Sequence, residues 1–120
     1  MAADDLRGIP RLIRAARCSF SALRWGFVEE EAVRLEMLGV LLFAPLAFWL
    51  GNTDVERALL IGSLLLILMV ELLNTGIEVT IDRISHEHHE LSGRAKDLGS
   101  AAVFVSLVNA AVIWGLILFS

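Results

Sequence analysis

The chain has 120 residues, 57% of them hydrophobic, and a mean hydropathy of +0.71. This apolar share exceeds the roughly 45–50% of a soluble domain, so the composition excludes a soluble fold with one large core and indicates a small integral membrane protein. The net charge of −4 conceals a basic start, because residues 1–26 carry five arginines against two aspartates. That segment is predicted to contact anionic lipid headgroups.

Residues 6–27 are predicted to form an amphipathic helix on the membrane surface. Apolar residues recur at spacings of three and four from Leu6 to Phe27, while arginines occupy the other faces. Pro10 suits a first helical turn, so the regular helix is expected to start near Ile9. Such a helix lies in the interface plane with its apolar stripe turned toward the acyl chains. A helix packed on a partner protein is the alternative.

Three apolar stretches are predicted to cross the membrane, over residues 35–53, 57–84 and 96–119. Each reaches the roughly 17 residues needed to span the hydrocarbon core. Pro45 is a candidate kink in the first stretch. The chain is therefore expected to be a single all-α membrane domain over residues 1–120, with one surface helix and three transmembrane helices.

The placement of Lys and Arg predicts how the three spans are oriented. The basic N-terminus and the connection over residues 83–96, which carries Arg83, Arg94 and Lys96, are both expected in the cytoplasm. The turn over residues 51–57 carries a single arginine and is expected on the other side with the C-terminus.

The second span contains a ladder of polar residues at membrane depth, where a charge costs about 2.5–3.5 kcal/mol. At about 100° per residue, Glu71, Asn74, Glu78 and Asp82 share one helix face. This face is expected to meet a neighbouring helix or a wet cavity rather than lipid. Packing between helices explains Asn74 and Asp82 about as well as a functional role does. For Glu71 and Glu78 a functional role is favoured, because a carboxylate is a costly means of holding helices together.

Other charged residues are expected at the same interface. Glu30 and Glu36 stand where the first span enters the membrane, and Lys96 and Asp97 where the third begins. Gathered carboxylates repel one another without a cation, and Mg²⁺ takes one or two carboxylates together with phosphate oxygens. The residue types therefore fit a metal–phosphate site without naming its reaction. The sequence has no P-loop or protein-kinase glycine motif, and "HEHHE" at 86–90 lacks the spacing of a zinc-protease motif.

Two segments, "ELLNTGIEVTIDRI" from Glu71 and "EHHELSGRAKDLGSAAV" from Glu87, resemble the prokaryotic diacylglycerol kinase family. The similarity extends from about Arg11 to Phe119. It implies a homotrimeric lipid kinase of the bacterial inner membrane, with its active sites between subunits at the cytoplasmic interface. The implied reaction converts ATP and diacylglycerol to ADP and phosphatidic acid with Mg²⁺.

The resemblance also implies roles for individual residues. Glu71 resembles the catalytic carboxylate, a general base beside the primary hydroxyl of the lipid, and Glu30 and Glu78 match the residues that hold the metal bridging the ATP phosphates. The further residues are, for the nucleotide, Arg11, Cys18, Glu30, Glu78, Glu87, His88, His89, Lys96 and Asp97; for the lipid, Arg11, Ala15, Ser19, Arg24, Trp25, Glu71 and Ser100; and, in support, Asn74, Asp82 and Glu36.

Several positions depart from the family pattern. The family often has tyrosines where this chain has Cys18 and His88, so adenine stacking or nucleotide affinity is expected to differ. Glu29 stands in place of an expected Asn and adds negative charge beside the metal. None of these departures involves Glu71 or Glu78, so the implied chemistry is expected to be retained.

Two alternative functions remain open. Undecaprenol kinase is a related enzyme with a similar ladder and a polyprenol acceptor, although "HELSGR" and the region around Trp25 favour diacylglycerol. A non-enzymatic, proton-conducting membrane oligomer is the alternative from another class, because intramembrane glutamates also build proton relays. That alternative leaves Glu30 and the basic "GRAK" segment without a role.

Overall fold

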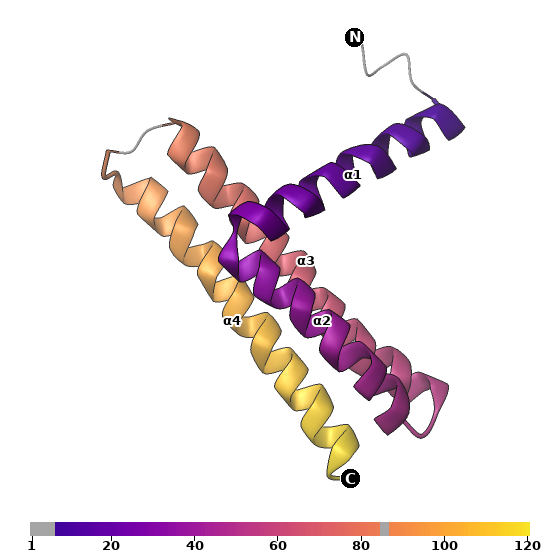
Figure 1. The fold of residues 1–120 in the computed structure, drawn as a ribbon. Helices are drawn as coiled ribbons and strands as arrows, with labels where there is room; N and C mark the ends of the chain where they lie inside the picture. Colours follow the sequence, from indigo (N-terminus) through magenta and orange to yellow (C-terminus); the bar gives the residue numbers. More distant parts are fainter. Residues whose placement is uncertain (1–6, 85–86) are drawn as a thin grey trace.

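Three helices run side by side and a fourth projects from them (Figure 1). In the residues that the structure describes, 7–84 and 87–120, the computed structural model has α1 (Ile9–Glu29), α2 (Glu31–Leu50), α3 (Asp54–Ile84) and α4 (Glu90–Leu118). The α3 helix packs against both α2 and α4, and α1 packs against the start of α2. The predicted all-α membrane class is thereby confirmed.

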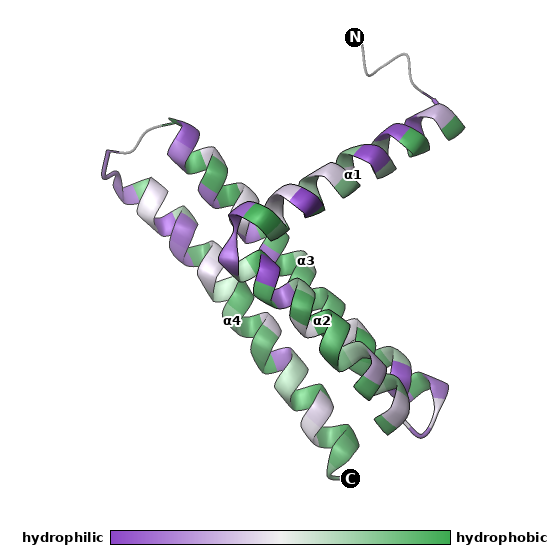
Figure 2. Cartoon of the chain, viewed as in Figure 1, coloured by the Kyte–Doolittle hydropathy of each residue, from purple (hydrophilic) through white to green (hydrophobic). Residues whose placement is uncertain are grey.

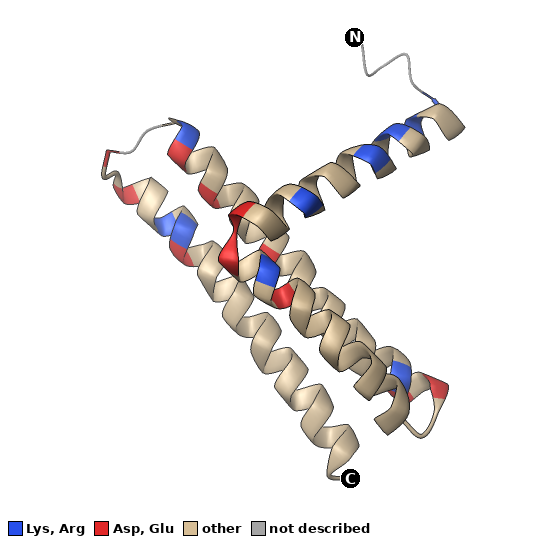
Figure 3. Ribbon diagram, in the orientation of Figure 1, with Lys and Arg blue, Asp and Glu red and all other residues tan. Residues whose placement is uncertain are grey.

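The α2, α3 and α4 helices are each long and apolar enough to cross a membrane. Hydrophobic residues cover most of their length (Figure 2), and most charged residues lie toward their ends (Figure 3), although Glu71 lies near the middle of α3. The α2 helix continues through Pro45, the candidate kink. The 31 residues of α3 span about 46 Å, more than the ~30 Å hydrocarbon core, so part of this helix extends beyond it.

The bend between α1 and α2 lies at Glu30, whose extended backbone (φ −119°, ψ 112°) separates the two helices. Gly26 faces Val33 across this bend, and a Cβ on Gly26 would lie 2.9 Å from the Val33 side chain. A glycine is therefore needed for the two helices to approach this closely. Leu6, where the predicted surface helix begins, lies outside the described residues.

The turn between α2 and α3 is closed by local hydrogen bonds. Thr53 Oγ1 accepts a hydrogen bond from the Glu56 N–H at 3.1 Å, so α3 begins at Asp54, slightly before the predicted span. The Arg57 guanidinium donates to the Phe48 carbonyl at 2.9 Å and to Asp54 Oδ1 at 3.0 Å. These contacts tie the start of α3 to the end of α2.

The α4 helix begins at Glu90, so the second half of the predicted polar connection over residues 85–94 is helical. The His89 ring caps this helix, because its Nδ1 accepts a hydrogen bond from the Leu91 N–H at 3.1 Å. Residues 85–86, within the predicted connection, lie outside the described residues.

The core between the three long helices is small and includes polar groups. Val33, Ala47 and Leu60 are fully buried. Between α3 and α4, the Trp114 indole N–H donates to Ser63 Oγ at 3.0 Å, and that hydroxyl donates to the Leu60 carbonyl at 2.8 Å. Such polar contacts hold helices together where lipid removes the hydrophobic incentive to associate.

Candidate active site

The polar ladder of α3 faces the neighbouring helices. The residues Glu71 and Asn74 are only 7% and 8% exposed, and Glu78 is half-buried. Asp82, one turn further along, is exposed at the end of the bundle that holds the α3–α4 connection. The ladder therefore leads from that end of the molecule into the helix bundle, as the helical periodicity predicted.

Four carboxylates gather around this ladder. Glu30, Glu36 and Glu78 all lie close enough to Glu71 to act on it electrostatically, although they come from the α1–α2 bend, α2 and α3. In the described part of the chain, none of the ion pairs involves any of these four carboxylates. Like charges gathered in this way repel one another, so the arrangement favours a bound cation.

The donor set of this cluster fits Mg²⁺, which prefers hard oxygen ligands and octahedral coordination. No three His, Cys, Asp or Glu side chains within the described residues are placed to hold a metal ion by themselves. Glu30 and Glu78, the predicted metal ligands, would therefore need phosphate oxygens, water or a second chain to complete the coordination. A site of this kind is typical of Mg²⁺ bound together with substrate phosphates.

Asn74 connects Glu78 to the α4 helix. Its Nδ2 donates a hydrogen bond to Glu78 Oε1 at 3.2 Å. Its Oδ1 is turned toward Gly99 of α4 and is buried without a hydrogen-bond partner among the described residues. A Cβ on Gly99 would clash with this oxygen, so the orientation of the Asn74 amide depends on the glycine.

Gly99 is a site residue that sequence reasoning missed. Its contribution is the space left by a missing side chain, and the pattern along α4 does not show which helix lies opposite that space. The signal available was the small pair Gly99–Ser100, which only Leu98 separates from the charged "GRAKD" segment.

A polar cavity of about 280 Å³ lies where α3 and α4 approach their connection. At its wall, Lys96 Nζ lies 3.0 Å from Asp82 Oδ1. Four of the predicted nucleotide residues share this cavity, because Glu87, His88 and His89 line it together with Lys96. The remaining lining residues are Ile81, Ser92 and Gly93.

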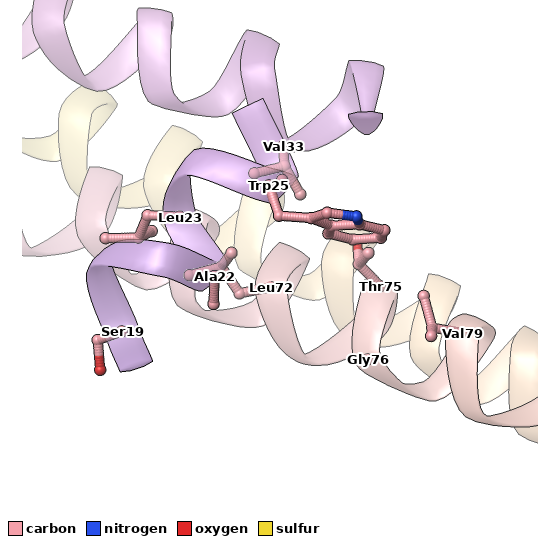
Figure 4. A pocket seen from close by; sticks show the side chains of 10 residues that line it. Ser19, Ala22, Leu23, Trp25, Val33, Leu72, Thr75, Gly76 and Val79 are labelled. Atoms are coloured by element: carbon pink, nitrogen blue, oxygen red, sulfur yellow. The ribbon is translucent and has the colours of Figure 1, made fainter. Parts of the chain in front are cut away.

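A second cavity, of about 420 Å³ and apolar, lies between α1, the start of α2 and α3 (Figure 4). Ser19 and Trp25, two predicted lipid residues, line it from α1. On α3 the lining residues lie next to the polar ladder in the sequence, so this cavity and the carboxylates are at the same depth. The α3 lining residues are Leu72, Thr75, Gly76 and Val79.

Several other predicted site residues line neither of these two cavities. Arg11 is near the free end of α1, which projects away from α3 and α4 (Figure 1). One chain by itself therefore does not bring Arg11 to Lys96. The predicted site residues that are exposed and line neither cavity are Arg11, Ala15, Cys18, Arg24, Asp97 and Ser100.

The fold and the site define a small multi-pass membrane protein with gathered carboxylates beside an apolar cavity. Residues 17–118 match the family model of prokaryotic diacylglycerol kinase. The chain is 45% identical to the diacylglycerol kinase of Escherichia coli (strain K12) over 118 residues, which are 98% of this chain and 97% of the relative. It is 46% identical to the Haemophilus influenzae diacylglycerol kinase over 112 residues, 93% of this chain and 95% of the relative. The chain belongs to the prokaryotic diacylglycerol kinase family.

Proposed function

We propose that the chain transfers the γ-phosphoryl group of ATP to the primary hydroxyl of diacylglycerol, forming phosphatidic acid and ADP. The observation that carries this proposal is the apolar cavity at the same depth along α3 as the carboxylate cluster. A lipid acceptor and a water-soluble phosphate donor need such adjoining apolar and charged surfaces in order to meet. The names of the relatives support diacylglycerol as the acceptor.

Glu71 is the proposed general base. It is nearly buried and directly precedes Leu72, which lines the apolar cavity. In this role its carboxylate accepts the proton of the lipid hydroxyl while the hydroxyl oxygen bonds to the γ-phosphorus. The bond from that phosphorus to the bridging oxygen of ADP breaks, and ADP leaves.

Glu30 and Glu78 are the proposed ligands of Mg²⁺, together with oxygens of the ATP phosphates. When bound, the metal neutralises charge on the phosphates during transfer. Asn74 holds the Glu78 carboxylate in one orientation through its 3.2 Å hydrogen bond. Glu36 adds negative charge close to Glu71, which strengthens the local preference for a cation.

The nucleotide is proposed to bind at the polar cavity between the ends of α3 and α4. Lys96 offers an ammonium group for a phosphate oxygen, and a charge-assisted hydrogen bond of this kind is stronger than a neutral one. Glu87, His88 and His89 line the same cavity and are the proposed contacts for the rest of the nucleotide. Asp97 follows Lys96 and lies exposed beside it.

The active form is proposed to be a homotrimer in the bacterial inner membrane, with each site shared between chains. The position of Arg11 supports this, because a nucleotide that contacts both Arg11 and Lys96 needs two chains (Figure 1). The α3–α4 connection and the α1–α2 bend lie toward one end of the bundle, and the C-terminus lies at the other. The positive-inside rule then places the connection and the N-terminus in the cytoplasm.

A direct assay tests the reaction. Purified protein in mixed micelles receives Mg²⁺, γ-labelled ATP and, in parallel, diacylglycerol or undecaprenol, with Glu71→Gln as the control. We expect label in phosphatidic acid and its loss in the variant. Label in undecaprenyl phosphate alone would overturn diacylglycerol as the acceptor. Label in neither product, with the protein intact, would overturn the proposed kinase reaction.

Mixed oligomers test the shared site. Arg11→Ala and Lys96→Gln chains are expected to be nearly inactive alone and to recover a fraction of activity when assembled together. The recovery is expected because some mixed sites combine an intact Arg11 from one chain with an intact Lys96 from another. Absence of recovery in verified mixed oligomers would contradict a site built from two chains.

A further inference from the structure

The Lys96–Asp82 ion pair differs from the other ion pairs of the described residues. Its nitrogen and oxygen lie 3.0 Å apart, and the two side chains are 43% and 49% exposed. The other pairs are local, between residues three or four positions apart. The Lys96–Asp82 pair instead joins α4 to α3 at the wall of the polar cavity.

The position of this pair gives Asp82 and a nucleotide phosphate the same partner. Both present anionic oxygens, and the Lys96 ammonium is a compact cation with donors only. Asp82 pairs with this ammonium from the α3 side of the cavity. A phosphate that binds in the cavity competes with Asp82 for the charge and the N–H donors of this ammonium.

Building on the proposed kinase function, we infer that Asp82 is a positioning residue that competes with the ATP phosphates for Lys96. Asp82 holds the Lys96 ammonium at the cavity wall and releases it to an incoming phosphate. When the nucleotide leaves, the carboxylate takes the ammonium back. The consequence is a nucleotide site that binds ATP and ADP less tightly than its lysine alone would allow, which favours exchange of product for substrate.

Replacing Asp82 by asparagine tests this competition, because Asn keeps the size of the side chain and removes its charge. We expect the dissociation constant of ATP and the apparent KM for ATP to fall by about 1.4- to 5-fold, the range that partly exposed ion pairs provide. Labelled ATP in equilibrium dialysis gives the dissociation constant without lipid, and the kinase assay gives KM and kcat separately. An unchanged or weaker affinity for ATP would overturn the inference.

The measurements separate this role from a structural one. Loss of an interhelical contact that only stabilises the fold would reduce the fraction of active protein, and therefore kcat, without tightening ATP binding. Because dialysis needs no acceptor, it decides the inference even if diacylglycerol is not phosphorylated. A wild-type enzyme without lipid kinase activity would count against the proposed function instead.

Two further variants separate competition for Lys96 from simple charge repulsion. Asp82→Asn in a Lys96→Gln background is expected to leave ATP affinity unchanged, because no ammonium remains to be released. Glu90→Gln removes one negative charge from the same region, where Glu90 pairs with Arg94 and does not line the cavity. Its ATP affinity is expected to match wild type. If either variant tightened ATP binding as much as Asp82→Asn does in the wild-type background, charge repulsion alone would explain the effect. That result would overturn the inference.

Discussion

Acidic residues lie in the first turn of α3 and again in its second half, and their surroundings differ. In the first turn, Asp54 pairs with Arg57 at 3.0 Å, and Glu56 Oε1 accepts a hydrogen bond from the Asn52 N–H at 3.0 Å. Each partner is within four positions along the chain. These charges close the turn between α2 and α3 and begin the helix, a structural task that nearby residues complete.

In the second half of α3, the carboxylates have another kind of neighbour. Glu71 and Glu78 are gathered with Glu30 and Glu36, which belong to the α1–α2 bend and to α2. None of the four takes part in an ion pair within the described residues. Bringing like charges together costs free energy, and such clusters are typical of sites that bind a cation or carry out chemistry.

The comparison shows that residue type alone does not separate a structural carboxylate from one proposed to be functional. The structural carboxylates are satisfied by their own turn. Those proposed to be functional are brought together from separate segments and form no ion pair within the described residues, although Glu78 accepts a hydrogen bond from Asn74. Four substitutions test this distinction.

The largest effect is expected for Glu71→Gln. Loss of a general base lowers the rate by about 10²–10⁴-fold, so kcat is expected to fall by that factor while ATP binding persists. The matched control is Glu56→Gln in the first turn of α3, which is expected to keep kcat close to wild type. Labelled phosphatidic acid formation measures both, and near-normal turnover in Glu71→Gln would remove the base assignment.

A smaller and more selective effect is expected for Glu78→Gln. The Mg²⁺ concentration for half-maximal activity is expected to rise at least about tenfold, as it does when metal sites lose even outer-shell partners. The apparent KM for diacylglycerol is expected to stay unchanged, since the apolar cavity is intact. A magnesium titration at fixed ATP checks this, and an unshifted curve would exclude Glu78 as a metal ligand.

Gly99→Ala probes the contact that orients Asn74. The added methyl group meets the Asn74 amide, so we expect stability to fall by about 1–3 kcal/mol, as in other overpacked sites. The magnesium requirement is expected to shift in the same direction as in Glu78→Gln. Gly115→Ala is the control on the same helix, because a Cβ there has no neighbour within 4 Å. Thermal unfolding in detergent compares the two, and equal stability would contradict the tight contact.

The smallest effect is expected at the first turn of α3. Arg57→Ala removes the ion pair to Asp54, the hydrogen bond to the Phe48 carbonyl and the packing of the guanidinium over the Phe48 ring, 5.1 Å from its centre. We expect a loss of about 1 kcal/mol in stability and unchanged KM values at a temperature where the protein stays folded. A change in the KM for ATP would show that this turn is not purely structural.

Much of the fold followed from composition and periodicity, whereas the ends of the helices did not. The predicted spans began at residues 57 and 96, but α3 begins at Asp54 and α4 at Glu90. Thr53 Oγ1 and His89 Nδ1 cap these helices and move their starts into segments that hydropathy treats as connections. A cap depends on the rotamer of one side chain. Hydropathy averaged over a stretch of residues does not detect that rotamer.

The sequence by itself determined the all-α membrane class, the three apolar spans and the single face that holds Glu71, Asn74 and Glu78. Backbone hydrogen bonding imposes 3.6 residues per turn, so the relations among residues on one helix can be worked out without a structure. Tertiary structure decided which groups meet across helices, such as Lys96 with Asp82. These contacts depend on how side chains pack between helices, and no local pattern along the chain encodes that packing.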